Sequence, residues 1–195
     1  MHNVIEQSEQ IQKQAWKVIN ETGVIKHWTS IGATINLVGS LKTGLLIKNR
    51  DIDFHIYTNP FSLCDSFLAV SKLAENNRIT EISYKNLIEE EDKCVEWHAS
   101  YVDLHGVTWK IDMIHILNES QFAGYFENVA DRISAVLTHE TREAILRIKS
   151  AIPDDKKVMS IQVYQAVIED GVRDIAGFWL WKKQNLNEGI VTWIP

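Results

Sequence analysis

The sequence predicts an α+β protein, with a mixed β-sheet core that is flanked by helices and followed by a C-terminal helical lobe. Strand-like alternation of polar and apolar residues occurs only before about residue 117. After residue 118, every periodic segment has the spacing of an amphipathic helix. We therefore expect an α/β domain over residues 1–117 and a helical domain over residues 118–195.

The first half is expected to open with a helix over residues 4–21, where apolar residues recur at helical spacing and Gly23 provides a stop. Residues 51–57 alternate polar and apolar side chains, as a half-buried strand does, and Asn59-Pro60 ends that strand. Leu104-His105-Gly106 predicts a hairpin turn. The other expected elements of this half are strands at 34–38, 79–84, 94–103 and 107–116 and a helix at 61–75.

The second half is expected to be helical throughout. Pro153-Asp154-Asp155 and Asp170-Gly171 favour turns and separate its periodic segments. Arg147 and Lys149 fall on one of these segments, where we expect both side chains to face solvent. The expected helices are 119–137, 139–152, 157–169 and 173–184.

Charge and cysteine content argue against several classes of protein. The 195-residue chain has a formal net charge of −6, whereas a protein that binds DNA or RNA over a broad surface normally has a basic surplus. Cys64 and Cys94 have no paired spacing, which argues against a disulfide framework or a zinc site. Because neither an apolar secretory signal nor a long apolar segment is present, we expect a cytoplasmic protein.

Two aspartates in the 51–57 segment are the first candidates for chemistry. On a strand, Asp51 and Asp53 project from the same face, while Ile52 and Phe54 project from the opposite face, into a core. Two neighbouring carboxylates repel each other unless a cation lies between them, and oxygen ligands suit Mg²⁺. A pair of this kind also occurs on ordinary exposed strands and in glycosyltransferases, so further residues must decide the function.

Asp112 is the third carboxylate candidate. It interrupts an otherwise apolar strand, where a carboxylate is expected to be paired, ligated or exposed at a site. If this strand lies beside residues 51–57, Asp112 completes a cluster that can hold two metal ions for phosphoryl transfer. Asp112 would then be the group that accepts the proton of the attacking hydroxyl.

Gly39-Ser40 follows an apolar strand and opens a helix or turn. Glycine allows the backbone to approach a phosphate closely, and backbone N–H groups with the serine hydroxyl can bind its oxygens. Lys42, Lys48 and Arg50 bracket this loop and can add positive charge.

These segments together resemble the DNA polymerase β superfamily of nucleotidyltransferases. The shared pattern is an apolar strand, Gly39-Ser40, ten further residues, Asp51-x-Asp53 and a third aspartate on a later strand. Residues 37–44 and 50–54 are especially similar to small bacterial members, such as aminoglycoside and lincosamide adenylyltransferases and the minimal nucleotidyltransferase antitoxins. Arg50 is a departure, because many members carry Ser or Thr just before the first aspartate.

The resemblance implies a nucleotidyltransferase catalytic domain over residues 1–117. Such an enzyme moves a nucleoside monophosphate, most simply AMP from ATP, to a hydroxyl group and releases pyrophosphate. The resemblance assigns Mg²⁺ or Mn²⁺ to Asp51, Asp53 and Asp112. It assigns the triphosphate to Gly39 and Ser40, with Lys42 and Arg50 as further cofactor-binding residues.

The acceptor and partners follow less directly. We expect the hydroxyl to belong to a small molecule or a protein, since the negative net charge disfavours nucleic acid, and a homodimer is compatible with the sequence. The alternative function is that of a nucleotide-binding antitoxin or regulatory partner that acts mainly by binding.

Three histidines near these segments are expected to have secondary roles. His55 shares the face of the aspartate pair and is expected to be hydrogen-bonded at the edge of the site. His115 is on the face opposite to Asp112 and is expected to be structural. His98 shares a polar strand face with Glu96, which is expected to face solvent; if that face lines the site, Glu96 is a reserve acid or base.

Overall fold

The computed structural model describes residues 3–185 and 192–195, and these form two compact units. One unit, here called the sheet unit, comprises Lys13–Lys42 and Arg50–Glu127. The other, here called the helical unit, comprises Thr43–Asn49, Asn128–Pro195 and the first twelve residues, as far as they are described. None of the helices in the described part of the chain combines the length and apolar character needed to span a bilayer.

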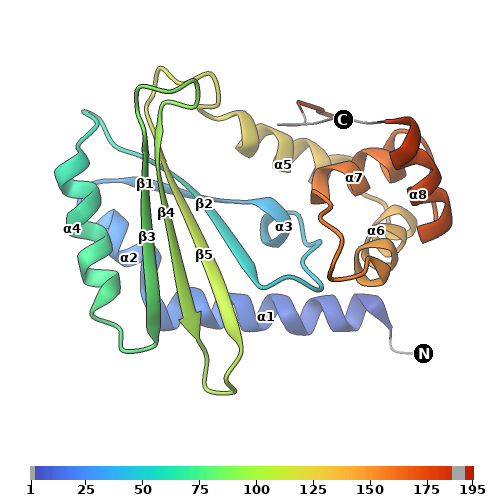
Figure 1. The fold of residues 1–195 in the computed structure, drawn as a ribbon, viewed down its shortest axis with the longest axis horizontal. Coiled ribbons are helices and arrows are strands. Elements are labelled where there is room, and N and C mark those ends of the chain that lie inside the picture. The colour runs from blue at the N-terminus through green and yellow to red at the C-terminus, as the bar shows by residue number, and fades with distance from the viewer. Residues whose placement is uncertain (1–2, 186–191) are drawn as a thin grey trace. The chain divides into compact units, whose positions relative to one another are not determined.

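The elements agree closely with the predicted ones (Figure 1). The helix or turn expected at Gly39-Ser40 is the short helix α3, and the short helix α2 is an addition. The predicted bounds of β1 and β2 hold to the residue, whereas β3 runs three residues further than predicted. In chain order the elements are α1 (Val4–Thr22), α2 (Val24–Thr29), β1 (Thr34–Val38), α3 (Gly39–Lys42), β2 (Asp51–Tyr57), α4 (Leu63–Ala74), β3 (Ile79–Leu87), β4 (Cys94–Val102), β5 (Thr108–Ile116), α5 (Tyr125–Val136), α6 (His139–Ala151), α7 (Ser160–Ile168) and α8 (Ile175–Gln184).

Local chemistry accounts for the main element boundaries. Gly23 has φ 64°, a left-handed conformation that glycine adopts readily, so the chain leaves α1 there and starts α2. Ser62 accepts a hydrogen bond from a backbone N–H in the first turn of α4, and Asp174 does the same for α8. The predicted helix at 119 begins instead at Tyr125, because successive turns occupy the preceding residues.

The described strands form one mixed sheet in the order β1-β2-β5-β4-β3. β2 and β5 are parallel, and the other neighbouring pairs are antiparallel. The α+β prediction with a mixed sheet is therefore confirmed. Because β2 and β5 lie side by side at the centre, residues that are about 60 positions apart in sequence become neighbours.

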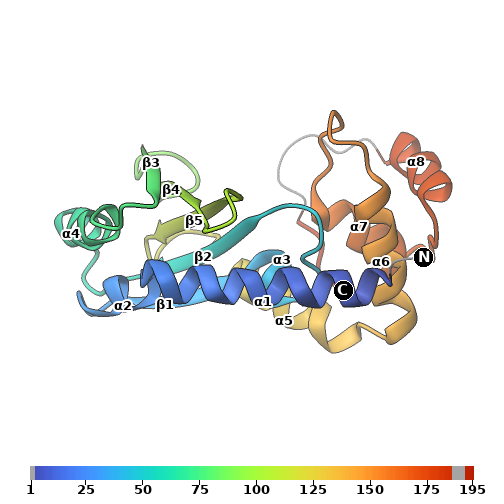
Figure 2. The same ribbon diagram turned by 90° about the horizontal axis from the view of Figure 1, so that it is seen from below.

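One face of this sheet forms the core of the sheet unit. Its side chains include Phe54, Trp97 and Met113, all nearly inaccessible to solvent. Helices α2 and α4, side by side in Figure 2, cover this face. The indole of Trp28 on α2 donates to the Met113 sulfur at 3.3 Å, and the indole of Trp97 donates to a serine hydroxyl on α4 at 2.7 Å. The opposite face carries the polar residues considered below.

The helical unit groups α6, α7 and α8 (Figure 2). Arg147 is exposed on α6, as predicted, and lies beside Glu143. Lys149 corrects the prediction: it is buried, and its ammonium donates to the Leu45 carbonyl at 2.8 Å and to the Tyr164 hydroxyl at 3.2 Å. Burial of the ammonium is possible because these partners replace the water that it loses.

Candidate active site

The candidate carboxylates meet on the polar face of the sheet. In the parallel ladder between β2 and β5, Asp53 is directly opposite Asp112. Neighbouring strands are about 5 Å apart, and side chains of opposed residues point to the same face. Asp51 precedes Asp53 by two residues and therefore projects from that face as well. All three carboxylates are half-buried, which leaves them accessible to a ligand.

Asp112 has a histidine partner on its other side. Antiparallel pairing between β4 and β5 sets His98 directly opposite Asp112, and His98 Nδ1 lies 2.7 Å from Asp112 Oδ1. His98 Nε2 lies 3.6 Å from a carboxylate oxygen of Glu96. The polar face of β4, which was expected to face solvent, thus extends the row of aspartates.

The charge state of His98 follows from these neighbours. Partial burial lowers its pKa, but the hydrogen bond and charge of Asp112 and the carboxylate of Glu96 together raise the pKa above its ordinary value. The two carboxylates therefore favour the protonated ring more than in a free histidine. Because the Asp112 carboxylate only accepts, Nδ1 is the donor of this hydrogen bond.

Gly39 creates the space that Asp53 occupies. Gly39 begins the four-residue helix α3 with φ 69°, and a Cβ atom built on it would lie 2.2 Å from Asp53 Oδ2. Any side chain at position 39 would therefore collide with the Asp53 carboxylate. The sequence predicted the approach of a phosphate to this glycine, which stays a prediction; the group that the structure places against it is the aspartate of the neighbouring strand.

The predicted phosphate contacts are separated by the fold. Ser40 and Lys42 remain on α3 next to Gly39, with Lys42 exposed. Arg50 lies elsewhere: its guanidinium is 5.3 Å from the ring centroid of Trp109, a residue of the buried strand face. Lys48 belongs to the helical unit, where its ammonium donates to the Ile152 carbonyl at 2.5 Å.

His55 continues the polar face toward the other end of β2. Its Nδ1 lies 3.3 Å from a carboxylate oxygen of Glu127, which also accepts from Tyr57 at 2.7 Å and from Asn36 at 3.3 Å. Burial raises the pKa of Glu127, but these hydrogen bonds outweigh burial and lower the pKa to about 2. Glu127 is thus an ionised anchor for the start of α5, and the expected hydrogen-bonded role of His55 is present.

His115 is structural, as predicted. It is fully buried between the rings of Trp28 and Phe61, and its Nε2 lies 3.0 Å from the Thr58 hydroxyl. Burial lowers its pKa to about 4, although the charge of Asp65 acts in the opposite direction. The imidazole is therefore neutral near pH 7.

The three aspartates are chemically suited to a hard cation, whereas in this structure Asp53 and Asp112 contact other residues of the protein. Carboxylate oxygens are the ligands that Mg²⁺ prefers, and the register brings Asp53 and Asp112 together. Within the described residues, however, no group of three His, Cys, Asp or Glu side chains is disposed to hold a metal ion. Asp112 is directed to His98, and Asp53 is packed against Gly39. Both aspartates therefore already have contacts within the protein in this arrangement.

A local signal in the sequence could have revealed the contact between His98 and Asp112. The hairpin turn between β4 and β5 is centred on His105. Residues equally distant from the centre of a tight hairpin oppose each other, and His98 and Asp112 each lie seven residues from it. The predicted turn at Leu104-His105-Gly106 therefore contains the information that pairs His98 with Asp112.

Comparison with known protein families gives one match that bears on this site. The family described as "Nucleotidyltransferase domain" matches residues 21–122, more than half of the chain. The matched segment contains Gly39, Asp53, His98 and Asp112. No curated protein sequence matches the chain.

Several solved structures share the fold. The non-canonical poly(A) polymerase complex GLD-2–GLD-3 aligns with 86% of this chain and 58% of its own, at 13% identity and a TM-score of 0.54. A cytoplasmic RNA terminal U-transferase aligns with 81% of this chain and 50% of its own, at 13% identity and a TM-score of 0.51. Cid1, an RNA terminal uridylyl transferase, aligns with 82% of this chain and 52% of its own, at 14% identity and a TM-score of 0.50. The chain thus spans between 50% and 58% of the length of these neighbours, and the likeness establishes the fold.

Proposed function

The chain belongs to the nucleotidyltransferase domain family within the polymerase β-like superfamily, and on this premise we propose that it transfers a nucleoside monophosphate from a nucleoside triphosphate to a hydroxyl group. The acceptor oxygen attacks the α-phosphorus, pyrophosphate leaves, and the hydroxyl proton passes to a base. AMP from ATP is the transfer that we propose first. The division into a catalytic domain over 1–117 and a helical domain over 118–195 is part of this proposal.

The observation that carries the proposal is the pairing of Asp53 with Asp112 on adjacent parallel strands, with Asp51 on the same face. A divalent cation bound by these carboxylates would neutralise the charge of the triphosphate and orient it. Asp112 is the residue that we assign to accept the hydroxyl proton, and His98 holds its carboxylate in a fixed orientation. The Asp53 carboxylate is positioned by its close packing against Gly39.

Gly39, Ser40 and Lys42 are assigned to the triphosphate. The loop lies beside β2 and presents backbone N–H groups, a hydroxyl and an exposed ammonium to an anion. Arg50 is proposed as a further cofactor-binding residue. Its guanidinium lies 5.3 Å from the centroid of the Trp109 ring, and this cation–π contact also supports the start of β2.

The proposal gives two candidate classes for the molecule that carries the acceptor hydroxyl. We keep a small molecule or protein hydroxyl as the first candidate, because the net charge is −6. The ribose hydroxyl at an RNA 3′ end is the second candidate, because GLD-2 is named in a non-canonical poly(A) polymerase complex and Cid1 is named for RNA terminal uridylyl transferase activity.

The test is a transfer assay with Mg²⁺ or Mn²⁺ and each of the four labelled nucleoside triphosphates. Acceptors are offered as separate pools: short RNA, hydroxylated small molecules and cell-extract protein. Nucleotide-dependent release of pyrophosphate with label in one pool supports the proposal and identifies the acceptor class. Tight nucleotide binding without transfer to any pool would favour the alternative of a regulatory or antitoxin protein. Absence of both binding and transfer would refute the proposal.

A further inference from the structure

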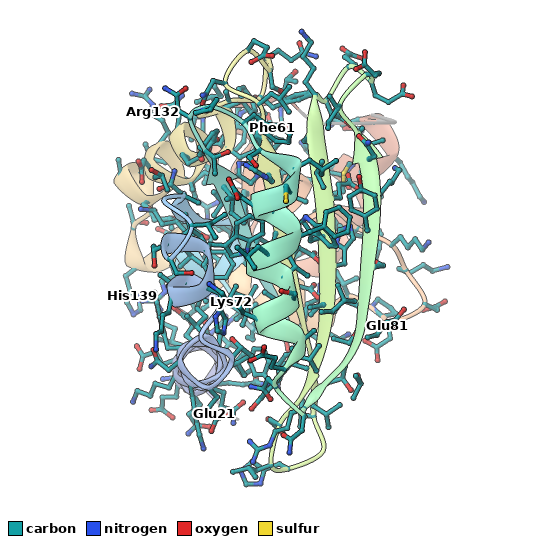
Figure 3. All side chains as sticks on the ribbon, turned by 90° about the vertical axis from the view of Figure 1, so that its left-hand side faces the viewer. Glu21, Phe61, Lys72, Glu81, Arg132 and His139 are labelled. Carbon is teal, nitrogen blue, oxygen red and sulfur yellow. The ribbon has the colours of Figure 1, made fainter. Side chains whose placement is uncertain are left out.

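β3 is an edge strand with nine residues, and its outer edge is open. β3 pairs with β4 on one side, and among the described residues no strand pairs with its other side. An edge strand presents a row of backbone N–H and C=O groups that can pair with another chain. Figure 3, which looks onto α4, shows β3 at the border of the sheet with Glu81 beside it. This edge is long enough to accept a further strand.

The central residues of β3 form a self-complementary sequence. Residues 81–85 read Glu-Ile-Ser-Tyr-Lys. The central serine is flanked on each side by an apolar or aromatic residue and then by a charged residue, and the two charges are opposite. If two copies pair antiparallel about a twofold axis at Ser83, Glu81 of each copy opposes Lys85 of the other. Ile82 then opposes Tyr84. Opposite charges in directly opposed positions stabilise a sheet, whereas like charges destabilise it.

Other features of β3 restrict which strand can be added. The register shift between Ile79 and Glu81 disturbs one end of the edge, and charged residues on an edge discourage pairing with an arbitrary strand. A partner must therefore supply matching charges, which a second copy does by symmetry. The Lys85 ammonium also lies 3.9 Å from a Glu96 oxygen in its own chain, but the Lys85 side chain is exposed, and ion pairs of exposed side chains contribute little to stability.

An exposed apolar cluster lies beside the same edge. The Phe67 ring on α4 is 5.1 Å from the Tyr84 ring on β3, and both pack on Trp97. Phe67, Leu68 and Tyr84 nevertheless retain exposed fractions of 47%, 48% and 39%. Aromatic side chains grouped on a surface in this way are typical of protein contact sites.

We propose that two copies of this chain form a homodimer by antiparallel pairing of their β3 strands about a twofold axis at Ser83. The pairing makes one continuous sheet from two sheet units and sets Glu81 opposite Lys85 twice. It brings the cluster of Phe67, Leu68 and Tyr84 next to the junction. Glu81 and Lys85 project from the same sheet face as Asp112, because Ser83 opposes His98 and His98 opposes Asp112. The pairing itself involves β3 and none of the three candidate metal ligands, so the proposal does not rest on the proposed transfer activity.

A charge-swap series tests the register. Sedimentation of the 195-residue chain at concentrations from about 1 to 100 µM is expected to show a reversible dimer. Glu81→Lys and Lys85→Glu each set like charges opposite one another twice, so each is expected to weaken dimerisation by about tenfold or more. The double variant Glu81→Lys with Lys85→Glu restores opposite charges and is expected to restore the dimer. Glu89→Lys, on the exposed loop after β3, is the matched control and is expected to have no effect.

A crosslinking series tests the axis itself. A residue on a twofold axis opposes its own copy, at a Cα separation of about 4.5 to 5.5 Å that suits a disulfide. In a Cys64→Ser background, which removes the exposed natural cysteine, Ser83→Cys is expected to form a disulfide-linked dimer on mild oxidation. Glu81→Cys opposes position 85 and is expected to remain unlinked.

The results of the sedimentation series can overturn the proposed dimer in three ways. A monomer over the whole concentration range would overturn the proposal. So would a dimer that ignores both single charge reversals, or a charge-swapped double variant as weak as the single variants. Circular dichroism of each variant confirms that these exposed substitutions leave the fold intact.

Discussion

His98 and Asp112 face each other across β4 and β5, with Nδ1 of the imidazole 2.7 Å from Oδ1 of the carboxylate. On its other side, Asp112 is directly opposite Asp53 across the parallel pair β5 and β2. One carboxylate thus has a histidine on one neighbouring strand and an acidic residue on the other. The first contact orients the Asp112 carboxylate, and the second sets it beside the aspartate with which we propose that it shares a cation.

The first prediction concerns His98 as a positioning residue. His98→Ala removes the donor that orients Asp112, so we expect the rate of nucleotide transfer to fall about tenfold or more, with little change in KM for the nucleotide. His98→Asn keeps an N–H donor near the position of Nδ1 and is expected to recover much of that loss. Steady-state kinetics of the three proteins check this. Equal activity of His98→Ala and the natural protein would show that Asp112 does not need this partner.

The second prediction concerns Gly39. Gly39→Ala adds a Cβ that would lie 2.2 Å from Asp53 Oδ2 at a positive φ, so the carboxylate must move. We expect a loss of about 1 to 3 kcal/mol in the free energy of unfolding, together with weaker nucleotide binding. The matched control is Gly32→Ala, which has φ 80° and no neighbouring atom within 4 Å. It carries the backbone strain without the collision and should leave nucleotide binding intact.

The third prediction follows from the buried His115. Its pKa in the fold is about 4, below the value of 6.5 expected for an unfolded chain. Above pH 6.5 the His115 imidazole is neutral in both the folded and the unfolded state, so it does not make the free energy of unfolding depend on pH. As the pH falls from 6.5 toward 4, the unfolded state takes up a proton that the folded state does not, and the free energy of unfolding falls by up to about 3 kcal/mol. Urea titrations of the natural protein and His115→Asn over this window should show a weaker pH dependence in the variant. Parallel curves would contradict the assignment.

The fourth prediction concerns Glu127 as an anchor. Glu127→Gln removes the charge that accepts from Tyr57, Asn36 and His55, and we expect it to cost about 1 to 3 kcal/mol at pH 7. Because the pKa of Glu127 is lowered to about 2, its contribution is complete above about pH 4.5 and is lost as the pH falls through 2. Chemical denaturation measures the cost, with the exposed Glu119→Gln as control.

Local sequence patterns were sufficient to predict most elements of the fold. β1 and β2 begin and end as predicted, because alternation and the adjacent Gly39 and Asn59 are local signals. The short helix α2 was missed, because six residues offer too little periodicity. The side-by-side position of Asp53 and Asp112 was stated only as a condition, since parallel pairing depends on a crossover that local sequence does not specify.

Side-chain environments were harder to predict than strands. Lys149 was expected in solvent, but it bonds to the carbonyl of Leu45, 104 residues away, a contact that no helical pattern encodes. The contact of the Arg50 guanidinium with the Trp109 ring was not expected either, because it depends on the pairing of β2 with β5. His98 was placed on the correct face, and only the register of the hairpin was needed to identify its partner.

The central claim is that Asp51 and Asp53 form part of a metal-dependent nucleotide site. Calorimetric titration with non-hydrolysable analogues of the four nucleoside triphosphates, in the presence of Mg²⁺ or Mn²⁺, tests it most directly. We predict binding of at least one analogue in the micromolar to millimolar range that disappears on chelation of the metal. We predict a loss of about tenfold or more in Asp51→Asn and in Asp53→Asn, with no change in the exposed control Asp155→Asn. Failure to bind any analogue, or binding that both variants leave unchanged, would contradict the account.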